Sequence, residues 1–589
     1  MWNILVRSAL FVLLALGVFV HGDPEDKRKS AADYYIKNLP GLSDDAGLMQ
    51  HAGHILIDES INGKIFFWLI HNRHIAEKRK FVIWLNGGPG CMDGLFLEIG
   101  PWRMNSDLTL RTEYGSWNMF ANVLFVDQPV GTGFSTVDTN GYVSNMTQIT
   151  DHFMKFLDEF FMVFPEYARD EIFITGESYA GVYIPYFASA ILKRNKKKTT
   201  QIDLRYDLKG IVIGNGWIDP ITQYEAYYSF ADINGLMDEE AKKQVKITLE
   251  KCQKLQETNV YIHESECERI LQDILDYTVK TENGQKTCIN QYDIRLRDTY
   301  PACGMNWPQE LKNITSYLRR QDVINAINAQ DKQEGWVECA GAVGSALDND
   351  PSPTSFTLLP DILKDIPVLL FSGDKDLICN INGTQSMIDS LEWNGDKGFK
   401  SAVPVDWHVN GTLVGNWKTA RGLHLATIYG ASHMVGYDRP VVATDMINRF
   451  LGFNYTYPDL GPPSSLGDDK LTITPPGAPT DDDDTYDGDD GNDEMWDRYY
   501  NARRYLNHKK NAGQPIKAVD YENNELEELV IETPLYDIGD EDEDHFGDSE
   551  DETDRHRDVP SAMGTQPYTD DADNGSGDSD TQGLKKRSK

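Results

Sequence analysis

The sequence predicts an α/β protein whose parallel sheet carries helices on both faces. From about residue 50, short apolar runs that end in turn residues alternate with segments of helical apolar spacing. A polar, cysteine-rich segment interrupts this alternation, and a segment rich in Pro, Gly and Asp follows it. Together these observations predict one α/β domain with an inserted helical cap and a disordered acidic tail.

The expected elements of the sheet follow one another between residues 80 and 435. Each expected strand is a short apolar run bounded by turn residues, as in the buried strands of a parallel sheet. The first expected helix ends before Pro165, which cannot continue it. Strands are expected at 80–88, 122–129, 171–176, 208–219, 366–380 and 423–435, and helices at 148–166 and 179–193.

Composition divides the chain into four parts. Arg7 precedes the apolar run 9–20, which is too short for an ordinary membrane span and predicts a secretory signal peptide. The polar interruption is typical of an insertion into a sheet domain. The predicted boundaries are 1–22 for the signal peptide, 23–457 for the α/β domain with its cap at about 220–335, and 458–589 for the tail.

The net charge of −37 is unevenly distributed. Residues 471–589 contain 33 acidic and 12 basic residues, a net of −21, so the first 470 residues carry the other −16. A nucleic acid would be repelled by this charge, so we predict no nucleic-acid partner. Acidic blocks of this kind are typical of solvated tails.

Seven cysteines and six N-x-[ST] sequons indicate an oxidising secretory compartment. An odd count leaves at least one thiol unpaired if all disulfides are intramolecular. Four cysteines crowd into 252–303, where the sequence does not fix their pairing. Since neither C-x-x-C nor H-E-x-x-H occurs, we predict no metal site. The cysteines are Cys91, Cys252, Cys267, Cys288, Cys303, Cys339 and Cys379, and the sequons begin at Asn145, Asn313, Asn382, Asn410, Asn454 and Asn574.

Three candidate catalytic residues each follow an expected strand: Ser178, Asp376 and His433. Catalytic groups of parallel sheets gather beyond the carboxyl ends of the strands. A serine hydroxyl needs an imidazole to take its proton, and a carboxylate must orient that imidazole. Singly, these residues also fit a helix cap, a loop carboxylate and a buried core histidine. Their chain order is that of the α/β-hydrolase fold, which we therefore predict.

Two glycine-containing stretches complete the candidate site. The sequence from Gly176 to Ala180 matches the strand-to-helix bend G-x-S-x-G, except for alanine in the last place. The stretch "WLNGGPGC" at 84–91 follows a strand and can present bare backbone N–H groups to an oxyanion, although an ordinary tight turn would look similar. We assign the oxyanion donors to the N–H groups of Gly88 and Tyr179.

Six motifs together resemble the serine carboxypeptidase family over about residues 31–455. Within that family the likeness is to the fungal pheromone-processing subgroup of the late Golgi, through "DYYIKNLPG", "TLLPDIL" and the acidic tail. The six motifs are "WLNGGPGC", "VDQPVGTGFS", "GESYAGVYIP", "GNGWIDP", "SGDKDLICN" and "SHMVGYDRP".

The resemblance implies roles for further residues. Asn86, Glu98 and Glu177 match the asparagine and two glutamates with which the family binds the substrate's terminal carboxylate. Because like charge and burial raise carboxyl pKa values, the glutamates should be protonated donors at mildly acidic pH. The resemblance also implies a Cys91–Cys339 disulfide, an unpaired Cys379 and no cofactor.

Two departures from the family pattern stand out. The family usually has two serines after the cysteine of "GGPGC", whereas Cys91 here is followed directly by Met92. We expect the shorter loop to pull Glu98 toward it. The Golgi relatives also carry a membrane helix after the acidic stretch, but no run beyond residue 458 approaches the ~20 apolar residues that a span needs.

We therefore predict a serine-type carboxypeptidase that removes C-terminal residues, preferentially Lys or Arg, from peptides and proproteins. The basic preference and a late Golgi location come from the resemblance, and a chain without a span should be luminal or secreted. One alternative is an acyltransferase or esterase on the same scaffold. Another is an inactive, carboxypeptidase-like binding protein, which the shortened loop would favour and the complete triad would not.

Overall fold

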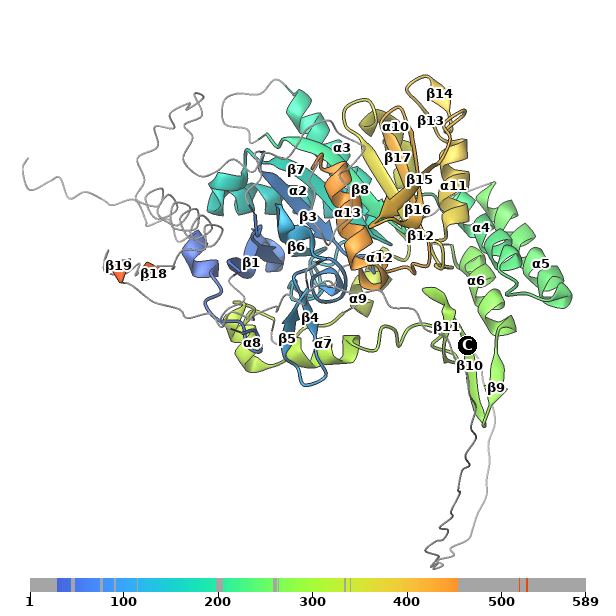
Figure 1. Ribbon diagram of the computed structural model, residues 1–589, viewed down its shortest axis with the longest axis horizontal. Coiled ribbons are helices and arrows are strands. Elements are labelled where there is room, and N and C mark those ends of the chain that lie inside the picture. The colour runs from blue at the N-terminus through green and yellow to red at the C-terminus, as the bar shows by residue number, and fades with distance from the viewer. Residues whose placement is uncertain are drawn as a thin grey trace, which may run out of the picture. The chain divides into compact units, whose positions relative to one another are not determined.

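The computed structural model of the protein describes most of residues 29–453 (Figure 1). The predicted signal peptide, the Cys91–Cys339 pair, Asn454 and Asn574 lie outside the described residues, as does the acidic tail except for residues 518–519 and 526–527. The chain divides into two units, Met1–Pro479 and Thr480–Lys589. In the first unit the structure describes residues 29–43, 48–74, 78–88, 92–113, 115–197, 205–257, 262, 264–332, 335–338 and 340–453. In the second unit it describes only the two-residue strands β18 (Ala518–Val519) and β19 (Leu526–Glu527).

A ten-stranded mixed sheet forms the centre of the first unit, in the order β1-β2-β6-β3-β7-β8-β12-β17-β16-β15. The six strands from β6 to β17 are parallel and almost completely buried, as their continuous apolar runs predict. Their bounds are β3 (Lys80–Leu85), β6 (Ala121–Asp127), β7 (Glu171–Glu177), β8 (Leu208–Gly214), β12 (Val368–Gly373) and β17 (Leu423–Ile428).

The four outer strands are antiparallel to their neighbours, so the sheet is mixed where the sequence predicted a parallel one. Short hairpins cause the difference. Asn62 and Asn410 occupy the left-handed region at φ of 47° and 50°. Gly411 follows Asn410 in the tight turn that joins strand 405–409 to strand 412–420. The outer strands are β1 (Gln50–Asp58), β2 (Gly63–Ile70), β15 (Val405–Val409) and β16 (Thr412–Ala420).

Helices α2 (Met146–Val163) and α3 (Ala180–Lys196) pack on each other and on the sheet. The Asn145 side chain caps α2 by accepting a hydrogen bond from the N–H of Gln148 at 3.1 Å. The rings of Phe153 and Phe187 stack with their centroids 4.0 Å apart between the two helices. Both predicted helices are confirmed. Helices α11 (Ile381–Ser390), α12 (Val435–Asp438) and α13 (Pro440–Phe450) follow the later strands.

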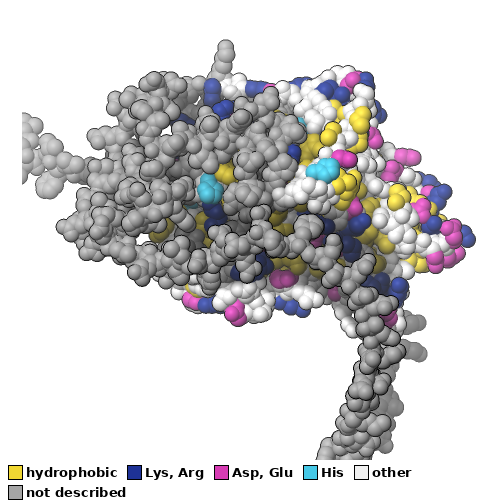
Figure 2. All heavy atoms as spheres, in the orientation of Figure 1, with side chains coloured by type: hydrophobic (Ala, Val, Ile, Leu, Met, Phe, Trp, Pro, Cys, Tyr) yellow, Lys and Arg dark blue, Asp and Glu magenta, His cyan; other side chains and the backbone are white. Residues whose placement is uncertain are grey.

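Between β8 and β12 the chain leaves the sheet and forms the cap. Helices α4 and α11 pack together, so the cap joins the sheet domain on that side (Figure 1). Over α5, Figure 2 shows basic and acidic side chains side by side, as on a solvated surface. The cap contains α4 (Pro220–Ile233), α5 (Glu239–Gln256), α6 (Ser265–Tyr277), β9 (Lys280–Glu282), β10 (Gln285–Asn290), β11 (Asp293–Thr299), α7 (Leu311–Leu318) and α8 (Gln321–Ala326), with α9 (Gly341–Leu347) and α10 (Leu359–Ile362) before β12.

Two disulfides cross-link the cap, and their pairing resolves what the sequence left open. Cys252 on α5 is bonded to Cys267 on α6, and Cys288 on β10 is bonded to Cys303. Cys379 is a free, buried thiol, as the resemblance implied. Among the described helices, none is both long and apolar enough to cross a membrane.

Candidate active site

The bend after β7 exposes Ser178 between the sheet and α3. Ser178 has a φ of 59°, in the left-handed region that non-glycine residues seldom occupy outside functional turns. Gly176 permits the bend, because a Cβ there would lie 2.1 Å from the carbonyl oxygen of Leu85 on the neighbouring strand. The added Cβ would also lie 2.8 Å from the Cβ of Ala180, the residue that departs from the motif. Because alanine is small, Ala180 does not obstruct the close approach of α3 to β7.

Backbone hydrogen bonds fix this bend to the loop after β8. The N–H of Ser178 donates to the carbonyl of Gly214 at 3.0 Å, and its own carbonyl accepts from Trp217 at 2.9 Å. The Ser178 carbonyl also accepts from Gly181 in the first turn of α3. The nucleophile candidate therefore has a position determined by backbone on both sides rather than by a flexible side chain.

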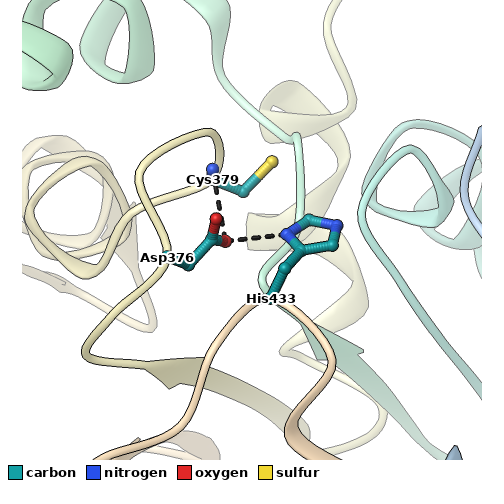
Figure 3. Close-up of side chains that lie close together, drawn as sticks. All are labelled: Asp376, Cys379 and His433. Carbon is teal, nitrogen blue, oxygen red and sulfur yellow. Dashed lines mark hydrogen bonds and ion pairs between the residues drawn. The ribbon is translucent and has the colours of Figure 1, made fainter. Parts of the chain in front are cut away.

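Asp376 and His433 are joined by a hydrogen bond of 2.8 Å between Oδ2 and Nδ1 (Figure 3). They follow β12 and β17, which pair in parallel, so their loops leave the same edge of the sheet. Both side chains are buried, at 0% and 4% exposure. In Figure 3 the second ring nitrogen of His433 points away from the carboxylate, which leaves it available to a proton donor on that side.

Asn215 is a residue of this site that the sequence reasoning missed. It is fully buried and has a φ of 39° just after β8. Its Nδ2 donates to Oδ2 of Asp376 at 2.7 Å, and its Oδ1 accepts from the N–H of Gly373 at 3.2 Å. The N–H groups of Ile378 and Cys379 also donate to the Asp376 carboxylate. Four donors, counting the imidazole, thus stabilise its charge and orientation.

The Cys379 thiol lies beside Asp376 and His433, with their potential ligand atoms within 4.8 Å of one another (Figure 3). Burial raises the pKa of this thiol, and the negative charges of Asp376 and Glu177 raise it further. The thiol therefore stays protonated and is a poor nucleophile or ligand. Asp376 and His433 are already hydrogen-bonded to each other. The three residues are therefore arranged as an acid–base pair with the small thiol side chain of Cys379 beside it.

The glycine loop after β3 lies directly against Ser178. A Cβ on Gly87 would lie 2.4 Å from the Cβ of Ser178, 2.9 Å from its Oγ and 2.9 Å from the backbone nitrogen of Tyr179. The absence of a side chain at Gly87 therefore keeps open the space in front of the hydroxyl, within hydrogen-bond reach of the Tyr179 nitrogen. Gly88 follows with a φ of 102° and is exposed.

Three polar side chains form a buried cluster next to Ser178. Glu98 is hydrogen-bonded to both Glu177 and Asn86, and these three side chains are between 1% and 3% exposed. Burial raises the pKa of Glu98 to about 7. Burial, then the neighbouring Glu98, raises the pKa of Glu177 well above its usual range. At mildly acidic pH the pair therefore retains protons.

Groups around the cluster hold Asn86 and Glu98 in place. The Oδ1 of Asn86 accepts from Trp84 Nε1 at 2.7 Å and from the N–H of Gly94 at 3.1 Å. This leaves its Nδ2 to donate to Glu98. The guanidinium of Arg103 donates to the backbone carbonyl of Glu98 at 2.6 Å. Although the loop after Cys91 is short, Glu98 therefore still contacts Asn86 and Glu177, the other two members of its predicted group.

The serine carboxypeptidase family model matches residues 40–452. The chain belongs to the serine carboxypeptidase family. "Pheromone-processing carboxypeptidase KEX1" of Tuber melanosporum is 46% identical over 470 residues, which cover 77% of this chain and 74% of that protein. "Pheromone-processing carboxypeptidase kex1" of Aspergillus oryzae is 48% identical over 443 residues, covering 73% and 70%.

A solved structure of a family member resembles most of the chain. It is KEX1(delta)p, a prohormone-processing carboxypeptidase from Saccharomyces cerevisiae, with 37% identity and a TM-score of 0.69. The match covers 74% of this chain and 99% of that one. The predicted fold class and the predicted serine-type carboxypeptidase are therefore confirmed, and the acyltransferase and inactive alternatives are not favoured.

Proposed function

We propose that the protein trims single residues, preferentially Lys or Arg, from the C-termini of proproteins in the secretory pathway. The observation that carries the proposal is the buried pair Glu98 and Glu177 beside Ser178, whose raised pKa values keep it protonated at mildly acidic pH. A free carboxylate is the group that such a pair can grip, and a peptide bond one residue away from it would lie at the serine. Relatives named for pheromone and prohormone processing support proprotein substrates.

In the proposed reaction Ser178 attacks the carbonyl carbon of the last peptide bond. His433 accepts the hydroxyl proton at Nε2 and later donates it to the departing amine. Asp376 holds Nδ1–H, which fixes the tautomer and stabilises the imidazolium. The acyl-enzyme is then hydrolysed by water activated by the same imidazole. The N–H groups of Tyr179 and Gly88 stabilise the oxyanion in the space that Gly87 leaves open.

The cluster of Asn86, Glu98 and Glu177 binds the C-terminal end of the substrate. Asn86 and the protonated pair donate hydrogen bonds to the terminal carboxylate in a water-poor site, where each donor counts for more than in water. A protonated pair attracts this carboxylate, whereas an ionised pair would repel it. Peptide binding should therefore be strongest in an acidic compartment such as the late Golgi, where we propose that the enzyme acts.

We further propose that Asp93 favours basic terminal residues. Asp93 is 5% exposed, and its charge raises the pKa of Glu177, so the two carboxyls lie within electrostatic reach. A lysine or arginine side chain brought in beside the terminal carboxylate would meet this negative charge. Glu338, a partly exposed carboxyl whose pKa is also raised by burial, is a second candidate for this role.

The test is a digest of matched peptides ending in Lys, Arg, Leu or Phe, followed by amino acid release. We expect kcat/KM to be higher for Lys and Arg by about 10-fold or more, and the preference to shrink in Asp93→Asn. Equal rates for all four ends would defeat the basic preference. Loss of release in Ser178→Ala would attribute the activity to this site, whereas transfer to a small alcohol without release would favour the acyltransferase.

The compartment is tested separately by glycosylation. Asn145, Asn313, Asn382 and Asn410 are all at least partly exposed, and Asn410 lies in the exposed β15–β16 turn. We propose that these sequons, with Asn454, carry glycans after passage through the secretory pathway. A glycosidase-dependent loss of mass, mapped to these peptides, is the expected result, and an unmodified protein from a fungal host would contradict it.

A further inference from the structure

The turn of the cap hairpin β10–β11 contacts both loops that carry the catalytic acid and base. We propose that this turn, and Arg295 just beyond it, position the Asp376–His433 pair for catalysis. The inference rests on the proposed roles of Asp376 and His433. It assigns to the cap a role in positioning the catalytic acid and base.

On the Asp376 side, the hairpin bonds to the backbone before and after the carboxylate. The N–H groups of Leu377 and Ile378 both donate to the carbonyl of Gln291 at 3.1 Å. The N–H of Ile294 donates to the carbonyl of Lys375 at 3.0 Å. Since these contacts bracket Asp376 on both sides, the hairpin limits how far its loop can move.

On the His433 side, the contact is to the catalytic residue itself. The backbone N–H of His433 donates to the carbonyl of Tyr292 at 2.9 Å. The Tyr292 ring also lies against the imidazole, with the ring centroids 5.2 Å apart. One residue of the hairpin turn therefore restrains both the backbone and the ring plane of the proposed general base.

Arg295 closes the arrangement from the outside. Its guanidinium donates to both carboxylate oxygens of Asp293 in the hairpin, at 2.7 and 2.8 Å. It also donates to the Gly430 carbonyl at 2.7 Å and to Asp438 Oδ2 at 2.9 Å. The same Oδ2 accepts the N–H of Ser432 at 2.6 Å, immediately before His433 in the chain. A planar, five-donor group suits such a junction, since it can bond several acceptors at once.

The hairpin itself is held rigidly enough to act as a support. The Cys288–Cys303 disulfide joins its base to the following segment, and the N–H of Gln291 donates to the Cys303 carbonyl at 2.9 Å. The N–H of Tyr292 donates to the side chain of Asn290 at 2.8 Å inside the turn. Positioning groups are effective when their own conformation is fixed in this way.

The experiment compares Arg295→Met with wild type in the full-length protein. We expect kcat to fall about 10- to 100-fold while KM changes little, because misplacement of the acid–base pair affects the chemical step and not carboxylate binding. The rate of labelling by a fluorophosphonate, which needs the activated serine but no peptide, should fall in parallel. Arg295→Lys, which keeps the charge and part of the donor set, should restore part of both rates.

Arg194→Met is the matched control. Arg194 forms a similar two-bond pair with Asp158, but it lies in the last turn of α3, and its described side-chain contacts are with Asp158 and Tyr206 rather than with the loops of Asp376 and His433. A kcat for Arg295→Met within about two-fold of wild type, or an equal fall in Arg194→Met, would overturn the proposal. If Arg295→Met does not fold, Asp438→Asn is the second variant to measure. An unchanged kcat in Asp438→Asn would also overturn the proposal.

Failure of this inference is distinguishable from failure of the proposed function. If labelling of the wild-type protein does not depend on Ser178, the proposed function fails and the positioning role fails with it. If labelling depends on Ser178 but is unchanged in Arg295→Met, only the positioning role fails.

Discussion

Glu98 and Glu177 share a side-chain hydrogen bond although both side chains are carboxyls and both are buried. Such a contact requires a proton between them, and burial raises the pKa of each. Glu98 lies in a short helix after the glycine loop and Glu177 ends β7, directly before Ser178, so the contact joins that helix to the strand that leads to Ser178. The pair is therefore a proton-dependent cluster beside the candidate nucleophile.

We predict that the KM for peptides rises as the pH rises through neutrality. The pKa of Glu98 is raised to about 7 and that of Glu177 lies well above its usual range, so both carboxyls hold protons at pH 5, and Glu98 loses its proton as the pH rises through 7. Glu177→Gln keeps a permanent donor and should show a flatter dependence of KM on pH. Steady-state kinetics from pH 4.5 to 8 measures this.

The control for this prediction is Glu239→Gln, an exposed position on α5. It should retain the wild-type profile. If Glu177→Gln also retained it, the pH dependence would not come from the glutamate pair.

Gly87→Ala should lower kcat strongly without unfolding the protein. An added methyl group would occupy the space 2.4 Å from the Cβ of Ser178 and 2.9 Å from the Tyr179 nitrogen, where we place the oxyanion. We expect kcat to fall by about 100-fold or more, as when oxyanion contacts are lost. Circular dichroism and the melting temperature report folding. Gly344→Ala on α9, where nothing lies within 4 Å of an added Cβ and no left-handed φ is required, is the matched glycine control. Near wild-type kcat in Gly87→Ala would contradict the assignment.

Asn215→Ala should lower kcat more than it changes KM. The substitution removes the 2.7 Å donor to Asp376 Oδ2, the same oxygen that accepts the bond from His433. With one support fewer, the carboxylate orients the imidazole less well, and we expect kcat to fall roughly 10- to 100-fold. Asn215→Asp, which places a second carboxylate beside the first, should be worse. A rise in KM at constant kcat would show instead that Asn215 acts in binding.

The parallel half of the sheet could be predicted because its strands are continuous apolar runs, whereas the outer strands could not. In β1, His51 and His54 interrupt the apolar pattern, yet both are buried because they hydrogen-bond to His71 and to the Phe134 carbonyl. In β16, which lies between β17 and the edge strand β15, polar residues break the alternation and the strand is half-exposed. The pattern of such strands depends on tertiary partners that a local window does not contain.

Within the site, the residues with chemistry of their own could be predicted, and those that support them could not. Asp376 and His433 follow strands in the order of a known fold and were placed from that order. Asn215 lies in the quoted motif "GNGWIDP", but its role depends on a left-handed φ and on the register between β8 and β12. Arg295 lies in a cap strand, and nothing in its neighbourhood along the chain indicates contact with the loop of His433.

Asp127 should make the folded state less stable as the pH rises. Its carboxyl is buried, Oδ2 accepts the Phe134 N–H at 2.7 Å, and burial raises its pKa to about 7. The folded state therefore binds the proton more tightly than the unfolded state does. By linkage this stabilisation is complete below about pH 4, and it is lost as the pH rises through 7. The full effect is on the order of 4 kcal/mol.

Asp127→Asn is uncharged at every pH and keeps an acceptor for the Phe134 N–H. We expect the variant to lose less stability than wild type between pH 4.5 and 7.5, in urea unfolding followed by tryptophan fluorescence. Asp389→Asn, an exposed carboxylate on α11, should leave the wild-type slope unchanged. The other buried acids with raised pKa, such as Asp170 at about 6, remain in both proteins, so the difference between the two slopes isolates Asp127. Parallel stability curves for wild type and Asp127→Asn would mean that Asp127 is already ionised in the folded protein, stabilised by the charge of Lys332.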